Sequence, residues 1–264
     1  DILLSGALIL DESASMTMLS LAKMVPTAIS SLMGTVVGVF NPQITIAYAE
    51  GDKEKLVDII KSCNRILIFI MSIPIAFLTA YGRDFYALWQ PTKDPDMLQR
   101  LSLLAVGVLY VSMSIQVLYH VFIITKKVKW NSLVVLGSGI CSSLLSLILL
   151  SKTDLGVACF PLSSMLTGVL RNMIFTPIYA ARCLEIRWNR FYSDIFLGFA
   201  SIGTITVLGL LSRMVVPIHS WITLLLTGVV MGPLALLVNF FVILRKQERN
   251  MVIGMVRSRL KGEA

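Results

Sequence analysis

Long apolar segments alternate with short polar segments along nearly the whole chain. An apolar stretch opens the sequence at Asp1–Leu10, and seven further segments have the length and composition of transmembrane helices. These seven spans are predicted at Met16–Phe40, Ile66–Tyr81, Leu101–Thr125, Ser132–Leu150, Gly156–Tyr179, Asp194–Leu211 and Trp221–Leu244. The pattern therefore predicts an all-α polytopic transmembrane bundle of about seven and a half spans, because a helix satisfies its own backbone hydrogen bonds in hydrocarbon.

Composition supports the same class of protein. Of 264 residues, 56% are hydrophobic and only 14% are charged, and the mean hydropathy is +0.81. These values exclude a water-soluble globule. The first residue is Asp1 rather than Met and lies in an apolar stretch, so we expect residues 1–264 to form one transmembrane lobe of a longer protein, beginning within a helix.

The net charge of +8 comes from basic clusters between the spans. With alternating spans, sixteen Lys and Arg fall on one side: Lys53, Lys55, Lys61, Arg65, Lys126, Lys127, Lys129, Arg182, Arg187, Arg190, Arg245, Lys246, Arg249, Arg257, Arg259 and Lys261. Five fall on the other: Arg83, Lys93, Arg100, Lys152 and Arg213. This bias predicts a multi-pass protein of the cytoplasmic membrane with its C-terminus in the cytoplasm. The clusters form no continuous stripe, so nucleic acid is not an expected partner.

Two polar segments are expected to lie at the membrane surface. Residues 51–63 are predicted to form a separate amphipathic interfacial helix, capped by Gly51 and Asp52, with an apolar face that includes Ile60. Residues 245–264 are predicted to be a basic cytoplasmic tail that lies along anionic lipid. Membrane lipids are therefore expected partners of both segments.

Two cations lie inside predicted spans, where each costs about 2.5–3.5 kcal/mol near a helix centre. They are Lys23 and Arg171. Either side chain could reach the headgroups on its stem or form a structural ion pair, and either could line a polar cavity. Asn172 follows Arg171 and favours the cavity at that position. Asp1 is a possible counter-ion.

Other polar and small residues have simpler interpretations. Gln116 and His120 are expected one turn apart on one helix face, and Asn239 is expected to join helices. Two small-residue pairs predict close packing within the lobe: Gly34 with Gly38, and Ser164 with Gly168. The four cysteines have no C-x-x-C spacing, so neither a disulfide, a metal site nor a cofactor is expected.

Several motifs resemble one family. They are N-P-Q-I-T-I-A-Y-A-E-G-D-K-E-K-L at residues 41–56, G-R-D-F-Y-A-L-W at 82–89, I-T-K-K-V-K-W at 124–130 and D-L-G-V-A at 154–158. The chain looks like a polysaccharide or O-antigen flippase of the multidrug/oligosaccharidyl-lipid/polysaccharide exporter superfamily. The resemblance covers nearly the whole chain and implies the C-terminal lobe of a fourteen-helix exporter, whose N-terminal lobe would be its partner.

The resemblance implies export of undecaprenyl-pyrophosphate-linked glycan by alternating access, for cell-surface polysaccharide biosynthesis. Lys23 and Arg171 would then lie on helices eight and twelve. Arg binds phosphate through a bidentate fork and Lys acts as a point charge. We therefore expect Arg171 and Lys23 to attract the pyrophosphate, while Asn172 and Gln116 donate or accept hydrogen bonds with sugar.

The sequence is compatible with three other functions. A multidrug or toxin cation antiporter of the same superfamily would need an acidic site, and Asp1 is the carboxylate predicted at depth. A membrane-embedded glycan polymerase or transferase would need catalytic groups on sizeable loops. The longest such loop, residues 82–100, carries charged residues but no His, Cys or nucleophile motif, so the chain is not expected to be an enzyme. A noncatalytic membrane scaffold is the third alternative.

Overall fold

The computed structural model describes residues 12–244, 249–250 and 253, and the regular elements in these residues are all helical. The elements are α2 (Glu12–Ala49), α3 (Lys53–Trp89), α4 (Pro95–Ser112), α5 (Leu118–Ile124), α6 (Val128–Lys152), η1 (Gly156–Ala158), α7 (Cys159–Leu170), η2 (Arg171–Phe175), α8 (Thr176–Cys183), α9 (Tyr192–Val215) and α10 (Trp221–Val242). Six helical segments in this part of the chain have the length and hydropathy of membrane spans: α2, α3, α6, Gly156–Cys183, α9 and α10.

The predicted span Leu101–Thr125 differs from the others. It is divided into α4 and α5 by a turn at residues 113–117, and it is not one of the six candidate spans. The turn is held by short backbone bonds such as Ser114 N to Val111 O at 3.0 Å and Leu118 N to Ile115 O at 2.8 Å. The opening stretch Asp1–Leu10 and most of the tail 245–264 lie outside the described residues.

Residues 51–63 do not form a helix of their own. Helix α3 begins at Lys53 and continues without interruption through Pro74 to Trp89. The expected cap is confirmed, because the Asp52 side chain accepts a hydrogen bond from Lys55 N at 3.0 Å. The predicted helix is thus observed as the first part of the longer helix α3, and its place at the membrane surface stays a prediction.

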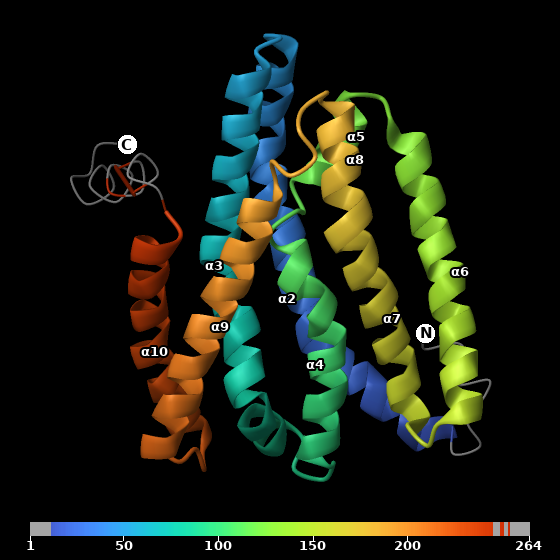
Figure 1. Cartoon of the computed structure of the whole chain (residues 1–264). Coiled ribbons are helices and arrows are strands. Elements are labelled where there is room, and N and C mark those ends of the chain that lie inside the picture. Colours follow the sequence, from blue (N-terminus) through green and yellow to red (C-terminus); the bar gives the residue numbers. More distant parts are fainter. Residues whose placement is uncertain (1–11, 245–248, 251–252, 254–264) are drawn as a thin grey trace.

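Successive helices run up and down, so that connections alternate between the two ends of the bundle (Figure 1). The connections at residues 50–52, 125–127 and 184–191 lie at one end, which we call the basic end. The connections at residues 90–94, 153–155 and 216–220 lie at the other. Within the described residues, the structure therefore brings the basic clusters at residues 53–65, 126–129 and 182–190 toward one end, as the alternation of spans requires.

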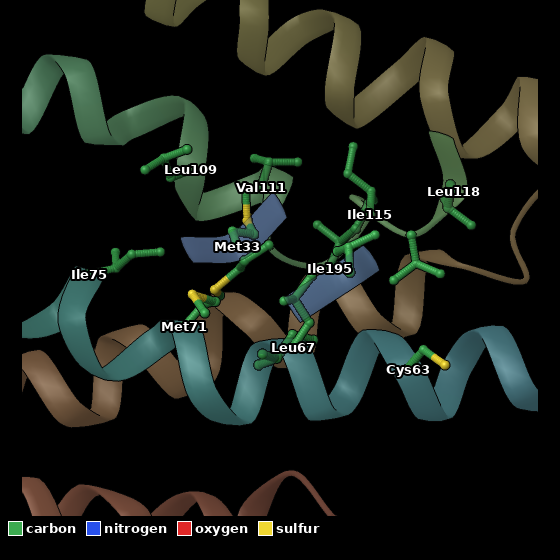
Figure 2. Close-up of a cluster of buried hydrophobic side chains, with 14 of the residues drawn as sticks. Met33, Cys63, Leu67, Met71, Ile75, Leu109, Val111, Ile115, Leu118 and Ile195 are labelled. Carbon is green, nitrogen blue, oxygen red and sulfur yellow. The ribbon is translucent and has the colours of Figure 1, made fainter. Parts of the chain in front are cut away.

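Helix α3 forms the centre of the bundle and packs against α2, α4, α9 and α10. Figure 2 shows the core here, with Met33 of α2, Met71 of α3, Val111 of α4 and Ile195 of α9 gathered around the broken segment. Helix α6 lies at the periphery and packs mainly on α7 (Figure 1). The centre is therefore fixed by apolar packing, and α6 is joined to it through α7.

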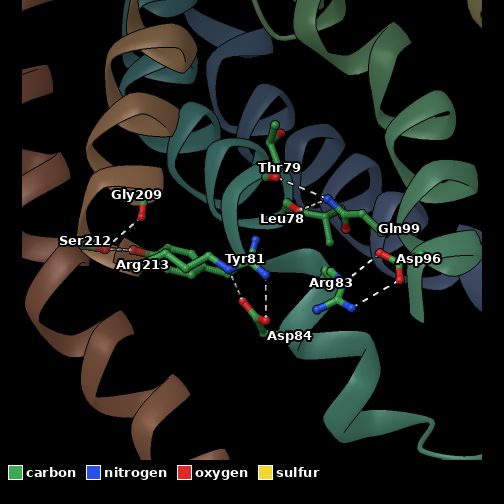
Figure 3. Close-up of polar contacts among 10 residues, drawn as sticks. All are labelled: Leu78, Thr79, Tyr81, Arg83, Asp84, Asp96, Gln99, Gly209, Ser212 and Arg213. Atoms are coloured by element: carbon green, nitrogen blue, oxygen red, sulfur yellow. Dashed lines mark hydrogen bonds and ion pairs between the residues drawn. The ribbon is translucent and has the colours of Figure 1, made fainter. Parts of the chain in front are cut away.

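Polar contacts tie the helices at the end opposite the basic end (Figure 3). Arg83 Nε lies 2.7 Å from Asp96 Oδ1 and links α3 to α4. Arg213 Nε lies 2.8 Å from Asp84 Oδ2 and links α9 to α3. These ion pairs join the ends of three central helices. An apolar cavity of about 360 Å³ lies beside them, between α3, α9 and α10.

Candidate functional site

Arg171 lies where the helix Cys159–Cys183 changes its hydrogen-bonding pattern. Residues Arg171–Phe175 form a short π-helix between α7 and α8, and Thr176 N donates to Arg171 O across it. Such bulges insert an extra residue into a helical turn and often occur at functional sites. The bulge faces the broken segment between α4 and α5, so two irregular segments meet inside the bundle.

A polar network joins these two segments and holds Arg171. Asn172 is 1% exposed, and its Nδ2 donates to Ser112 Oγ at 2.8 Å. Its Oδ1 accepts from Tyr119 Oη at 2.9 Å and from Arg171 Nε at 3.3 Å. Arg171 Nη1 also donates to Ser138 Oγ on α6 at 3.1 Å. The guanidinium is thus oriented by neutral partners, which leave its positive charge in place.

A groove of about 790 Å³ runs along α6 and α7 beside Arg171. Its polar lining comes from one face of each helix: Ser138, Ser142, Ser143, Ser164, Thr167 and Arg171. The only buried residues of α6 are Ser142 and Ser146, whereas its leucine and isoleucine side chains are largely exposed. Helix α6 therefore turns hydroxyls toward α7 and apolar side chains outward, as a lipid-facing helix does.

Lys23 lines a second cavity, of about 310 Å³, between α2, α4 and α7. Val108 and Ser164 line both this cavity and the groove of Arg171. The two predicted cations therefore flank adjoining spaces on either side of α4 and α7. The side chain of Lys23 is half-buried on α2.

The remaining predicted residues are placed differently. Gln116 lies in the turn between α4 and α5 and is half-buried, and within residues 12–244 no hydrogen bond joins its side chain to Arg171 or Asn172. His120 lies on α5, where its Nε2 is 3.0 Å from Thr45 Oγ1 of α2. Gln116 lies within the turn and His120 within α5, so the regular α-helix that was expected around both residues is interrupted at Gln116. Asp1 lies outside the described residues.

Sequence reasoning missed a buried ion pair near the basic end. Asp194 is fully buried at the start of α9, and its Oδ1 lies 3.8 Å from Arg65 Nε of α3. Asn64 Nδ2 lies 3.4 Å from Asp194 Oδ2. The sequence placed Asp194 at a span boundary, where a carboxylate meets water. In the described residues, no group of three or more His, Cys, Asp or Glu side chains is arranged to bind a metal ion.

The predictions about helix packing have mixed outcomes. Asn239 joins three helices as expected, since it accepts from Ser201 Oγ at 2.7 Å and donates to Ser72 Oγ at 2.7 Å. Gly168 packs closely, because a Cβ there would lie 3.0 Å from Val108. No described atom lies within 4 Å of the corresponding positions at Gly34 and Gly38. Packing of that pair within this lobe is therefore not observed.

One ion pair at the basic end is marked by a shifted pKa. Glu185, between α8 and α9, accepts a hydrogen bond from Lys53 Nζ of α3 at 2.5 Å. This contact with Lys53, with a smaller contribution from Lys127, lowers the pKa of Glu185. Above the ordinary pKa of glutamate, the Glu185 carboxylate is therefore ionised and its pairing with Lys53 stabilises the fold. This stabilisation is lost as the pH falls through the lowered pKa.

Comparison with known proteins places the chain among membrane proteins. It is 26% identical over 255 residues to the Bacillus subtilis (strain 168) protein named "Uncharacterized membrane protein EpsK". The match covers 97% of this chain and 50% of that protein, so the chain spans about half the length of this curated relative. No family model matches the sequence, and no solved structure matches it. With its six apolar helices, the chain is a multi-pass membrane protein.

Proposed function

We propose that this chain is one lobe of a membrane exporter that moves a lipid-linked oligosaccharide from the inner to the outer leaflet by alternating access. The observation that carries the proposal is the setting of Arg171. Its guanidinium lies at a π-bulge, beside a groove lined by hydroxyl groups, and faces a broken helix. Interrupted helices in transporters commonly contribute to substrate sites near the middle of the bilayer.

The chemistry of the cargo fits this groove. A pyrophosphate group and hydrated sugars cannot cross hydrocarbon unaided, because each unsatisfied polar group there costs several kcal/mol. Arg171 supplies a positive charge for the phosphate, and the serine and threonine hydroxyls supply hydrogen bonds for sugar. Lys23 supplies a second charge in the adjoining cavity. Asn172 is buried and already bonded, so its part in this proposal is to position Arg171.

The exposed face of α2 supports a second lobe. Thr27, Ser30, Ser31, Gly34, Thr35, Gly38 and Thr45 are all exposed along this helix. Small and hydroxyl side chains on a membrane helix favour close contact with another helix or with a polar cavity. This surface fits the N-terminal lobe that the resemblance implies.

The antiporter alternative needs a carboxylate that faces a cavity. Asp194 is the fully buried carboxylate within residues 12–244, and it lies against Arg65 and Asn64. Its charge is therefore compensated within the lobe. Asp94, Asp96 and Asp154 line a cavity of about 1020 Å³ together with Arg100, but they lie at the start of α4 or in the connection after α6. The site at Arg171, inside a span, therefore favours an anionic cargo over an organic cation.

The proposal is tested by transport in proteoliposomes that contain the full-length protein and a fluorescent lipid-linked oligosaccharide. We expect Arg171→Gln to reduce transfer between leaflets roughly tenfold or more, since it removes a charge-assisted contact. Arg171→Lys keeps the charge and should retain part of the activity. Arg187→Gln, outside the spans, is the matched control. Unchanged transfer with Arg171→Gln would exclude the proposed role of this residue.

A further inference from the structure

A separate cavity lies at the basic end, away from the groove of Arg171. It has a volume of about 650 Å³ and is formed by the start of α6, the connection before it, and α8. We call it the basic pocket and define it by its lining residues: Lys127, Lys129, Trp130, Phe175, Tyr179, Arg182 and Cys183. Three of these seven side chains are cationic and none is a carboxylate.

The backbone adds to the positive potential of the basic pocket. Helix α6 begins at Val128 with no side-chain cap and no acidic residue in its first turn. Its first N–H groups and the positive end of its dipole therefore remain available to an anion. Lys127 Nζ donates to Cys183 O at 3.5 Å, and Tyr179 Oη donates to Lys127 O at 3.0 Å. These bonds hold the helix start beside α8.

Aromatic rings form the apolar wall of the basic pocket. Phe175 and Tyr179 are stacked with ring centroids 5.0 Å apart, and Tyr179 also contacts Phe122 at 5.2 Å. Trp130, in the first turn of α6, also lines the pocket and is 62% exposed. Amphipathic rings of this kind are favoured at the level of lipid headgroups. The pocket thus combines cations at the polar end of a membrane helix with a surface suited to the start of a lipid tail.

We propose that the basic pocket binds the phosphate of a membrane lipid. Arg182 supplies a fork for two phosphate oxygens, Lys127 and Lys129 supply point charges, and the first turn of α6 supplies N–H donors. A lipid is favoured over a soluble phosphate because the aromatic wall lies at the end of membrane spans. Basic pockets between transmembrane helices are known to hold anionic headgroups.

The position of the basic pocket connects it with Arg171. Arg182, Tyr179, Phe175 and Arg171 follow one another at intervals of three or four residues on one helical segment. Arg182 lies eleven positions after Arg171, or roughly 16 Å along the axis at the α-helical rise. A phosphate-bearing lipid in the pocket would therefore lie in line with the groove. Lipid binding itself does not depend on the proposed export function.

The test measures lipid binding by native mass spectrometry of the full-length protein released from nanodiscs. We expect Lys129→Gln/Arg182→Gln to weaken binding of phosphatidylglycerol, of a polyprenyl pyrophosphate, or of both, roughly tenfold. The matched control is Lys126→Gln/Arg187→Gln, which removes two charges from the same end but does not alter the pocket lining. Binding by this control should change less than twofold.

The lipid probes distinguish the possible sources of the phosphate. Loss of phosphatidylglycerol binding identifies a site for a resident lipid, whereas selective loss of polyprenyl pyrophosphate binding identifies an entry site for the proposed cargo. Equal losses in the two double variants, or no loss in either, would reject the pocket. Inorganic pyrophosphate that binds as tightly as the lipids would reject a lipid ligand. If the double variant does not fold, Lys129→Gln, on the exposed start of α6, is compared with Lys126→Gln by the same criteria.

Discussion

At the scale of single residues, Asn172 connects the two irregular segments of the bundle. We expect Asn172→Leu to destabilise the protein by about 1–3 kcal/mol, because Tyr119 would lose its acceptor in a partly buried position. The measurement is the midpoint of unfolding by sodium dodecyl sulfate in mixed micelles. The same variant frees Arg171 Nε from one partner and should lower transport in the assay described above.

Tyr119→Phe is the control for this prediction. It removes a donor, yet Asn172 Oδ1 still accepts from Arg171, so the loss of stability should be clearly smaller. Equal losses in the two variants would contradict the proposed network. The sequence drew attention to Arg171 and Asn172 because they are adjacent and polar. The sequence did not indicate that Ser112 and Tyr119 would contact Asn172. They lie more than fifty residues away and reach it only when the helices pack.

At the scale of helices, Gly209 allows α9 to pack closely on α3. A Cβ at Gly209 would lie 2.8 Å from Ala80 Cβ and 3.3 Å from the Tyr81 ring. We expect Gly209→Ala to destabilise the protein by about 1–3 kcal/mol through overpacking, despite the higher helix propensity of alanine. Gly203→Ala is the control on the same helix, where no described atom lies within 4 Å. It should be neutral or stabilising in detergent unfolding, and a loss equal to that of Gly209→Ala would argue against close packing as the cause.

The hydropathy of the sequence predicted most of the helices well, because a helix that crosses a bilayer needs about twenty mostly apolar residues. The predicted span Ser132–Leu150 is observed as Val128–Lys152, and Trp221–Leu244 as Trp221–Val242. The division of Leu101–Thr125 was not predictable in this way. Its turn at residues 113–117 contains neither glycine nor proline, and Met113, Ile115 and Val117 are fully buried. The backbone conformation of this turn depends on how its side chains pack against the neighbouring helices. Mean hydropathy over a segment does not detect such packing.

At the scale of the whole molecule, two ion pairs join the tip of the α2–α3 hairpin to the connection between α8 and α9. Lys53 Nζ lies 2.5 Å from Glu185 Oε2, and Arg190 Nη2 lies 2.6 Å from Glu54 Oε2. Both pairs are exposed, so they contribute little to stability and are weakened by salt. They are useful as markers of the fold, because they join segments that are more than 130 residues apart in the sequence.

Carbodiimide, which condenses an amine with a carboxylate, should link Lys53 to Glu185 without a spacer. The lowered pKa of Glu185 keeps its carboxylate charged at the mildly acidic pH of this reaction. Peptide mass spectrometry should detect the cross-link, and Glu185→Gln should abolish it. The Lys55–Glu50 pair, at 2.6 Å within the hairpin, is the internal control. A Lys55–Glu50 product without a Lys53–Glu185 product would mean that the hairpin and the α8–α9 connection do not meet.

The same cross-link tests whether this lobe moves as one body. In the proposed alternating access, one lobe rocks against the other around the groove of Arg171. Lys53 and Glu185 belong to the same lobe, so a covalent bond between them should not impede export of the fluorescent oligosaccharide. The control is the Glu185→Gln protein treated with the same reagent, and the two proteins should export at the same rate. Transfer that falls in proportion to the yield of cross-link would instead show that the connection between α8 and α9 must separate from α3 during transport. In that case the lobe would not move as one rigid body, and its basic end would open during transport.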